Sequence, residues 1–257
     1  MVYKVVIKDN KKSPLKYLSD LDNFQNGKEY VFKPGINIIV GENGCGKTTL
    51  MNLIRKYLMV DYTECGVGTY RSNINCLYDG ILDKNVFKDG VDVYADYQRN
   101  TFRLSHAGEK EKNQAINSFE DFGTMFNQKT SSTGESVLVA INSLFSYMFS
   151  KKAPLTYDYS QFKESDPLYW EYIKSHQQEG SDEWTILMDE PDRNLDIENI
   201  SQIKGILSFH KEQTQIIAVV HNPLLIYSLS KKRSINIIEM TEGYIHKVNQ
   251  LVKNLIR

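Results

Sequence analysis

A glycine-rich segment between an apolar run and a helix-like pattern contains the residues whose types and spacing best suit chemistry. The segment reads GENGCGKT from Gly41 to Thr48, with a glycine at positions 41, 44 and 46. Backbone N–H groups in such a loop, placed at the N-terminus of a helix, attract phosphate. The lysine adds a positive charge, and the threonine hydroxyl can bind Mg²⁺. The segment therefore predicts a phosphate-binding loop.

The same residues satisfy G-x-x-x-x-G-K-[ST], the Walker A pattern of nucleotide-binding loops. A strand predicted at 36–40 and a helix predicted after Gly46 supply the structural context that this pattern requires. The alternative is a structural turn with a chance lysine, and this context disfavours it. Lys47 is expected to reach the β- and γ-phosphates of ATP, and Thr48 to bind Mg²⁺. The predicted ATP-binding residues are Gly41, Glu42, Asn43, Gly44, Cys45, Gly46, Lys47, Thr48 and Thr49.

Two adjacent carboxylates follow the apolar run 184–188, which predicts a buried strand. Asp189 at the end of such a strand can hold Mg²⁺ through water, and Glu190 is placed to orient or deprotonate an attacking water. The alternative is that both acids merely begin the next helix, where negative charge is favoured. That alternative is weak for two acids directly after a buried strand in a chain with a Walker A loop. We therefore predict Asp189 as a metal ligand and Glu190 as the catalytic base.

The segment from Asp189 resembles the Walker B motif and D-loop of ATP-binding cassette (ABC) ATPases, because Asp189-Glu190-Pro191 is followed by Leu195-Asp196. His221, just after the apolar run 216–220, is similar to the switch histidine of that family. The resemblance implies that Glu190 is the catalytic base and that His221 contacts the γ-phosphate. It also implies that Asp196 communicates across a dimer.

Two further pieces of the ABC pattern are expected between these motifs. Gln98, after a strand predicted at 91–97, resembles the Q-loop glutamine, which contacts Mg²⁺ and the water. The segment SSTGES resembles the signature motif, with Ser132, Gly134 and Glu135 as its functional residues. Ser132-x-x-Glu135 is also a helix capping box. Both interpretations predict a capped helix N-terminus, and in the family this terminus faces the γ-phosphate held by the other subunit.

The departures from the transporter pattern point to a branch of the superfamily. Thr133 replaces the first signature glycine and Glu135 replaces the glutamine, which is similar to SMC, RecF and "overcoming lysogenization defect" ATPases. Those relatives act on DNA or drive nucleases in repair and phage defence. The interval from Lys47 to Ser132 is too short for the long coiled-coil arms of SMC-type repair ATPases.

The alternation of strands and helices predicts an α/β fold. The expected architecture is a P-loop NTPase of ABC-ATPase-like type, with a mixed sheet around a parallel core, flanking helices and a helical signature subdomain. We expect residues 1–257 to form a single domain, with the signature helical region at about 99–183. That region includes an insertion at about 151–183, which is either a surface excursion with a short helix or a docking element for a partner.

Other expected elements include strands at 2–8, 29–33 and 216–220 and a buried helix at 135–149. Ile200, Ile203 and Leu207 recur at helical spacing, which predicts a helix between the last two apolar strands. Residues 235–248 are predicted to form a closing β-hairpin with Gly243 in its turn. No aromatic residue stands out as an adenine-stacking partner: Tyr17 and Tyr30 are candidates, and packing is the favoured role for either side chain.

Composition limits the class of protein. The formal net charge is −1, so no global charge indicates a polyanionic partner. No apolar stretch approaches the roughly 20 residues that span a bilayer, and the charged N-terminus does not resemble a signal peptide. Three cysteines without a C-x-x-C pair argue against a zinc site or a disulfide framework. We therefore expect a soluble protein of a reducing compartment, the cytoplasm.

The motifs together predict an Mg²⁺-dependent ATPase that dimerises around two ATP molecules. Such a dimer would control an effector protein, a nuclease or another nucleic-acid enzyme. Short lysine runs such as Lys11-Lys12 are either nucleic-acid contacts or, more commonly, solvated surface. The alternative is the nucleotide-binding subunit of an ABC transporter, which would need a separate membrane partner. A module that senses nucleotide without hydrolysing it is disfavoured, because Glu190 and His221 are both present.

Overall fold

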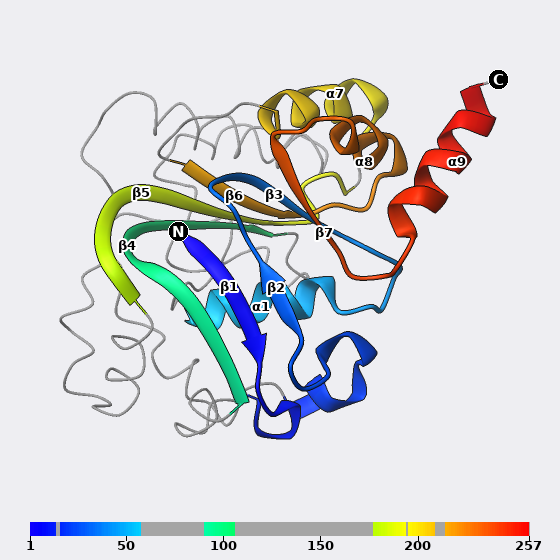
Figure 1. The fold of residues 1–257 in the computed structure, drawn as a ribbon. Helices are drawn as coiled ribbons and strands as arrows, with labels where there is room; N and C mark the ends of the chain where they lie inside the picture. Colours follow the sequence, from blue (N-terminus) through cyan, green and yellow to red (C-terminus); the bar gives the residue numbers. More distant parts are fainter. Residues whose placement is uncertain (14–15, 58–89, 106–176, 194, 209–213, 257) are drawn as a thin grey trace, which may run out of the picture.

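The computed structural model describes residues 1–13, 16–57, 90–105, 177–193, 195–208 and 214–256. Its centre is a seven-stranded sheet with the order β2-β1-β4-β5-β6-β3-β7 within this part of the chain (Figure 1). The five neighbouring strands β4, β5, β6, β3 and β7 run parallel, whereas β1 is antiparallel to both of its neighbours. The strands are β1 (Val2–Ile7), β2 (Glu29–Val31), β3 (Gly35–Val40), β4 (Val91–Ser105), β5 (Gln177–Asp189), β6 (Thr214–Val219) and β7 (Ile235–Glu239).

The central strands β3 and β6 are buried at every position, as continuous apolar runs in a parallel sheet are expected to be. Helix α1 (Lys47–Tyr57) covers one face, where Leu50, Leu53 and Ile54 are fully buried in one apolar cluster. Helices α7 (Ile197–Ile206), α8 (Pro223–Ser230) and α9 (Tyr244–Ile256) contribute to a second cluster on the opposite face (Figure 1). The predicted mixed α/β sheet with a parallel core and flanking helices is therefore confirmed.

The short segment between β1 and β2 lies against α1 rather than in the sheet. It forms three 3-10 turns: η1 (Asn10–Lys12), η2 (Lys16–Asp20) and η3 (Asp22–Phe24). Leu18 and Phe24 from these turns are fully buried in the cluster that also contains Leu50 and Leu53 of α1. The segment thereby packs against α1.

The register of the parallel strands places the carboxyl ends of three strands side by side. Ile39 of β3 pairs with Val219 of β6, and Val219 also pairs with Asp189 of β5. The chain segments that follow these three strands therefore leave the sheet side by side at its carboxyl edge. In open parallel sheets this edge is where ligands bind. The fold thus places the Walker A loop, the acidic pair and His221 at a common edge.

Strand β4 is longer than predicted, because its ladder with β5 continues to Ser105. Strand β5 likewise begins at Gln177, not at position 184. The predicted helical region at 99–183 is therefore wrong at both ends, since 99–105 and 177–183 are strand. Pairing between the two strands extends each of them beyond the stretch that looks apolar in the sequence. Residues 106–176, which include the predicted helix at 135–149 and most of the insertion, lie outside the described residues.

The predicted closing hairpin is also wrong. Gly243 lies in the turn as expected, with φ 72°, but the chain then forms helix α9 instead of a second strand. Val248 and Val252, four residues apart, are buried in the same cluster as Leu225 and Leu229 of α8. The burial of residues four positions apart shows that this segment is a helix. In the sequence, this spacing appears only when residues after position 248 are included.

Candidate functional site

The Walker A loop connects β3 to α1, and Lys47 at the first position of α1 folds back over it. The Lys47 Nζ donates hydrogen bonds to the carbonyl oxygens of Gly41 at 2.9 Å and of Glu42 at 2.8 Å. Only 4% of Lys47 is exposed. These two carbonyls hold the ammonium group inside the loop, next to the N-terminus of α1. The first backbone N–H groups of a helix have no hydrogen-bond partner within the helix.

Gly46 is the glycine of this loop for which space is most restricted. Its φ is +98°, a conformation that L side chains rarely adopt. A Cβ at this position would lie 2.4 Å from Cε2 of Phe24, which is fully buried in η3. The loop therefore passes directly over the aromatic ring that the N-terminal 3-10 turns provide. Asn23, the neighbour of Phe24, also holds the loop, because its Nδ2 donates to the Cys45 carbonyl at 2.9 Å.

The C-terminal elements hold the other side of the loop. The Glu42 N–H donates to the Thr241 Oγ1 at 3.1 Å. The Glu42 carboxylate forms an exposed ion pair with Lys247 of α9 at 2.9 Å. Glu42 thus points toward α9, away from the concave side of the loop.

Asp189 ends β5 beside the start of α1. The Thr48 Oγ1 donates a hydrogen bond to the Asp189 Oδ1 at 3.3 Å, and only 8% of Asp189 is exposed. A hydroxyl and a carboxylate side by side are oxygen ligands of the kind Mg²⁺ prefers. The described residues contain no group of three or more His, Cys, Asp and Glu side chains that could hold a metal. This pair fits Mg²⁺ that takes its remaining ligands from water and substrate phosphates.

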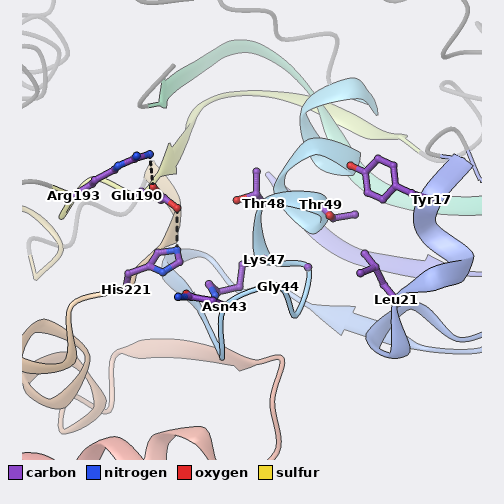
Figure 2. A pocket seen from close by; sticks show the side chains of 11 residues that line it. Tyr17, Leu21, Asn43, Gly44, Lys47, Thr48, Thr49, Glu190, Arg193 and His221 are labelled. Atoms are coloured by element: carbon purple, nitrogen blue, oxygen red, sulfur yellow. Dashed lines mark hydrogen bonds and ion pairs between the residues drawn. The ribbon is translucent and has the colours of Figure 1, made fainter. Parts of the chain in front are cut away.

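Glu190 lies between two nitrogen-bearing side chains. Its Oε1 lies 3.2 Å from the His221 Nε2, and its Oε2 forms an ion pair with the Arg193 Nη1 at 3.1 Å (Figure 2). The backbone of Glu190 has φ +55°, which is uncommon for a residue with a side chain. Its N–H donates to the Val219 carbonyl at 3.1 Å, so β6 helps to hold this conformation. Such strained positions cluster at functional sites.

Asp192 is a site residue that the sequence interpretation missed. It is 5% exposed, and its Oδ2 accepts a hydrogen bond from the His221 N–H at 2.8 Å and another from the Asn222 N–H. Asn222 is the N-cap of α8 and accepts from the Leu224 N–H at 2.9 Å. A carboxylate in the loop after a strand carries no periodic signal, so only its three-dimensional contacts identify it.

A cleft of about 600 Å³ joins these groups. Figure 2 shows the Walker A loop in the middle, with Glu190, Arg193 and His221 on one side and Tyr17 and Leu21 on the other. The lining residues are Tyr17, Leu21, Asn43, Gly44, Gly46, Lys47, Thr48, Thr49, Glu190, Arg193 and His221. Gly41, Glu42 and Cys45, which were predicted to bind ATP, are not among them. Tyr17 is 46% exposed, whereas Tyr30 is 3% exposed and packs on Phe24, so only Tyr17 faces the cleft.

The backbone of Gln98 lies inside a strand, several residues before the end of that strand beside Asp189. It was predicted to follow a strand, but it lies within β4 and pairs with Ser181, whereas Ser105 pairs with Asp189. Seven residues of strand correspond to about 23 Å along the chain. The prediction that Gln98 follows its strand is therefore wrong, because the strand continues past it, and its role as a metal ligand stays a prediction.

The remaining predicted site residues have different outcomes. Asp196 is the N-cap of α7, where its side chain accepts a hydrogen bond from the Asn199 N–H at 2.7 Å. Ser132, Gly134 and Glu135 lie outside the described residues. Among the helices that the structure describes, none is long and apolar enough to cross a membrane.

Comparison with known proteins identifies the family. The family model described as AAA domain matches residues 17–241, which is most of the chain and includes the whole cleft. This family is found in SMC- and RecF-like ATPases, which confirms the resemblance that the motifs indicated. No curated protein matches the chain significantly. The chain therefore belongs to the AAA-domain family of nucleotide-binding P-loop ATPases. The Walker A loop with Lys47 and the acidic end of β5 agree with this family.

Proposed function

We propose that the chain binds Mg²⁺-ATP in this cleft and hydrolyses it to ADP and phosphate. The observation that supports the proposal best is the convergence of Lys47, Thr48, Asp189, Glu190 and His221 around one cleft at the carboxyl edge of three neighbouring strands. A phosphate loop without an acid could only bind nucleotide. The presence of Glu190 beside the same cleft favours hydrolysis.

The triphosphate is proposed to lie along the Walker A loop. The loop N–H groups and Lys47 would bind the β- and γ-phosphates, and the Lys47 ammonium would exchange its two loop carbonyls for phosphate oxygens. Thr48 and Asp189 are the residues proposed to hold Mg²⁺, which supplies positive charge to the phosphates during cleavage. Tyr17 lies on the side of the loop away from Glu190, so it is proposed to contact the adenine ring.

Glu190 is proposed to orient the attacking water and to accept its proton. His221 is proposed to contact the γ-phosphate from the next strand. Its distance of 3.2 Å from Glu190 supports a shared location at the γ-phosphate end of the cleft. The buried Asp192 would hold the backbone of His221 in place through the bond at 2.8 Å.

The finer part of the proposal is a homodimer that closes around two ATP molecules. Ser132, Gly134 and Glu135 of one subunit would complete the γ-phosphate site of the other, and Asp196 would lie at the interface. An apolar side chain next to Asp196 supports this, because Ile197 is 77% exposed in the described part of the chain. Leu224, near His221 at the start of α8, is 47% exposed.

The dimer is proposed to act in the cytoplasm and to control an effector, a nuclease or another nucleic-acid enzyme. The nucleic-acid link in this part of the proposal is suggested by the family, which is found in SMC- and RecF-like ATPases. The second candidate, a transporter subunit, has no specific observation in its favour.

Hydrolysis is tested with Glu190→Gln. This variant keeps the shape of the side chain but cannot accept the proton, so it should bind Mg²⁺-ATP and hydrolyse it on the order of 10²–10⁴ times more slowly. Glu29→Gln is the matched control, because Glu29 lies exposed on β2 and pairs only with Lys4 among the described contacts. Wild-type turnover in the Glu190→Gln protein, measured as phosphate release, would overturn the assignment of the base.

Dimerisation is tested by light scattering of the Glu190→Gln protein with and without Mg²⁺-ATP. We expect ATP to increase the molar mass to that of a dimer. Adding Gly134→Asp should abolish this increase, because a carboxylate would face the phosphates of the partner's nucleotide. Retention of both ATP-dependent association and turnover with Gly134→Asp would show that the segment SSTGES is only a helix cap.

A further inference from the structure

Arg193 carries the positive charge in the cleft to which no motif assigns a role. It follows the acidic pair by three residues and lines the cleft beside Glu190 and His221 (Figure 2). Its Nη1 lies 3.1 Å from the Glu190 Oε2. The Arg193 side chain is 55% exposed, and an ion pair this open to water contributes little to stability. The fold therefore does not depend on the pair.

The charges around Glu190 show what is needed at this end of the cleft. Its carboxylate has a nitrogen of His221 at 3.2 Å on one oxygen and the Arg193 guanidinium at 3.1 Å on the other. A γ-phosphate placed here would bring further negative charge next to the carboxylate, and like charges at short range repel. A cation that faces both groups removes this conflict. Among the described residues that line the cleft, the permanently charged cations are Lys47 and Arg193.

Lys47 approaches the phosphates from the loop, where its Nζ lies against the Gly41 and Glu42 carbonyls and the residue is 4% exposed. Arg193 approaches from the opposite wall of the cleft. The guanidinium has five N–H donors in a planar fork, and the ion pair with Glu190 uses Nη1. The other donors remain for an anion, and the fork matches phosphate oxygens well.

We propose that Arg193 binds the γ-phosphate of ATP and thereby distinguishes ATP from ADP. The inference rests on the proposed ATP site and adds a residue to it. Glu190 holds the guanidinium in position before the nucleotide arrives, so the side chain loses little freedom on binding. ADP lacks the phosphoryl group that Arg193 contacts, so its affinity does not depend on this residue.

The test is calorimetric titration with Mg²⁺-ADP and with the non-hydrolysable analogue Mg²⁺-AMP-PNP. Arg193→Gln should weaken AMP-PNP binding about tenfold, the effect of losing a charge-assisted hydrogen bond to phosphate. Its ADP affinity should stay within about twofold of wild type, since the β-phosphate contacts are unchanged. Arg193→Lys keeps the charge without the fork and should lose only about threefold for AMP-PNP. Arg233→Gln removes the same charge from an exposed position outside the cleft lining and should change neither affinity.

Two failures are distinguishable. If wild-type protein binds neither nucleotide, the proposed ATP site is wrong and the role of Arg193 is wrong with it. If wild-type protein binds both nucleotides and Arg193→Gln leaves the ratio of the two affinities unchanged, the ATP site stands and the role of Arg193 is overturned. A loss of ADP affinity as large as that of AMP-PNP would overturn it as well.

Discussion

The Asp192 carboxylate accepts a hydrogen bond from the backbone N–H of His221 at 2.8 Å, and so links the loop after β5 to the residue after β6. The same oxygen accepts from the Asn222 N–H, at the N-terminus of α8. Negative charge is favourable at such a terminus. Because Asp192 is 5% exposed, water does not readily replace these bonds. The position of His221 therefore depends on a carboxylate that neither nucleotide nor metal needs to touch.

Asp192→Ala should leave the two N–H groups without their acceptor and lower the free energy of unfolding by about 1–3 kcal/mol. It should also lower kcat more than it raises KM for ATP, because His221 shifts while the Walker A loop stays intact. Asp192→Asn keeps an oxygen acceptor, so it should retain more of the free energy of unfolding and more of kcat than Asp192→Ala does. Urea unfolding and steady-state ATPase assays measure the two effects. Equal kcat values for Asp192→Ala and wild type would show that His221 does not need this anchor.

Gly46→Ala should disrupt the Walker A loop, because the added Cβ would lie 2.4 Å from the Phe24 ring. We expect loss of nucleotide binding and a lower free energy of unfolding. Gly44→Ala is the matched control, since Gly44 also has a positive φ, +80°, but no atom within 4 Å of its added Cβ. In urea unfolding, this control should show the backbone strain alone, about 1–2 kcal/mol. Urea unfolding and calorimetry with ATP compare the two variants. Equal losses of unfolding free energy and of ATP affinity would show that contact with Phe24 is not the cause.

Tyr17→Ala should weaken ATP binding about tenfold if its ring stacks on adenine, as stacking of one base on an aromatic side chain contributes about 1–3 kcal/mol. The affinity for inorganic tripolyphosphate, which lacks a base, should not change. Tyr94→Ala, a similarly exposed tyrosine on β4, serves as the control. Calorimetry with both ligands separates the two ends of the cleft. An equal loss for ATP and tripolyphosphate would place Tyr17 at the phosphates instead.

Burial raises the pKa of Tyr30 well above its ordinary value of 10.0, with a smaller contribution from the nearby Cys45. The folded state therefore holds this proton more tightly than the unfolded state does. The resulting stability is present below about pH 10 and is lost as the pH rises from there toward the folded-state pKa. Urea unfolding at pH 8 and pH 11 should show a smaller alkaline loss for Tyr30→Phe than for wild type.

Local spacing in the sequence was enough to predict the Walker A loop, the acidic pair after β5 and the P-loop NTPase fold. Each of these depends on neighbours in the chain: an apolar run that must be buried, a turn that needs glycine, and polar residues at the end of a strand. The family match over residues 17–241 confirms the resemblance to which these motifs led. Continuous apolar runs also predicted the fully buried strands β3 and β6, because central parallel strands are apolar on both faces.

Contacts between distant segments determined the rest. Pairing with β5 keeps Gln98 inside a strand, and packing against α8 makes residues 244–256 a helix. Burial separates Tyr30 from Tyr17, although both lie in the same part of the chain. Asp192 and Arg193 acquire partners only where the carboxyl ends of β5 and β6 come together, since Asp189 pairs with Val219. Such roles depend on the register between strands far apart in the chain, and no local pattern of residues encodes that register.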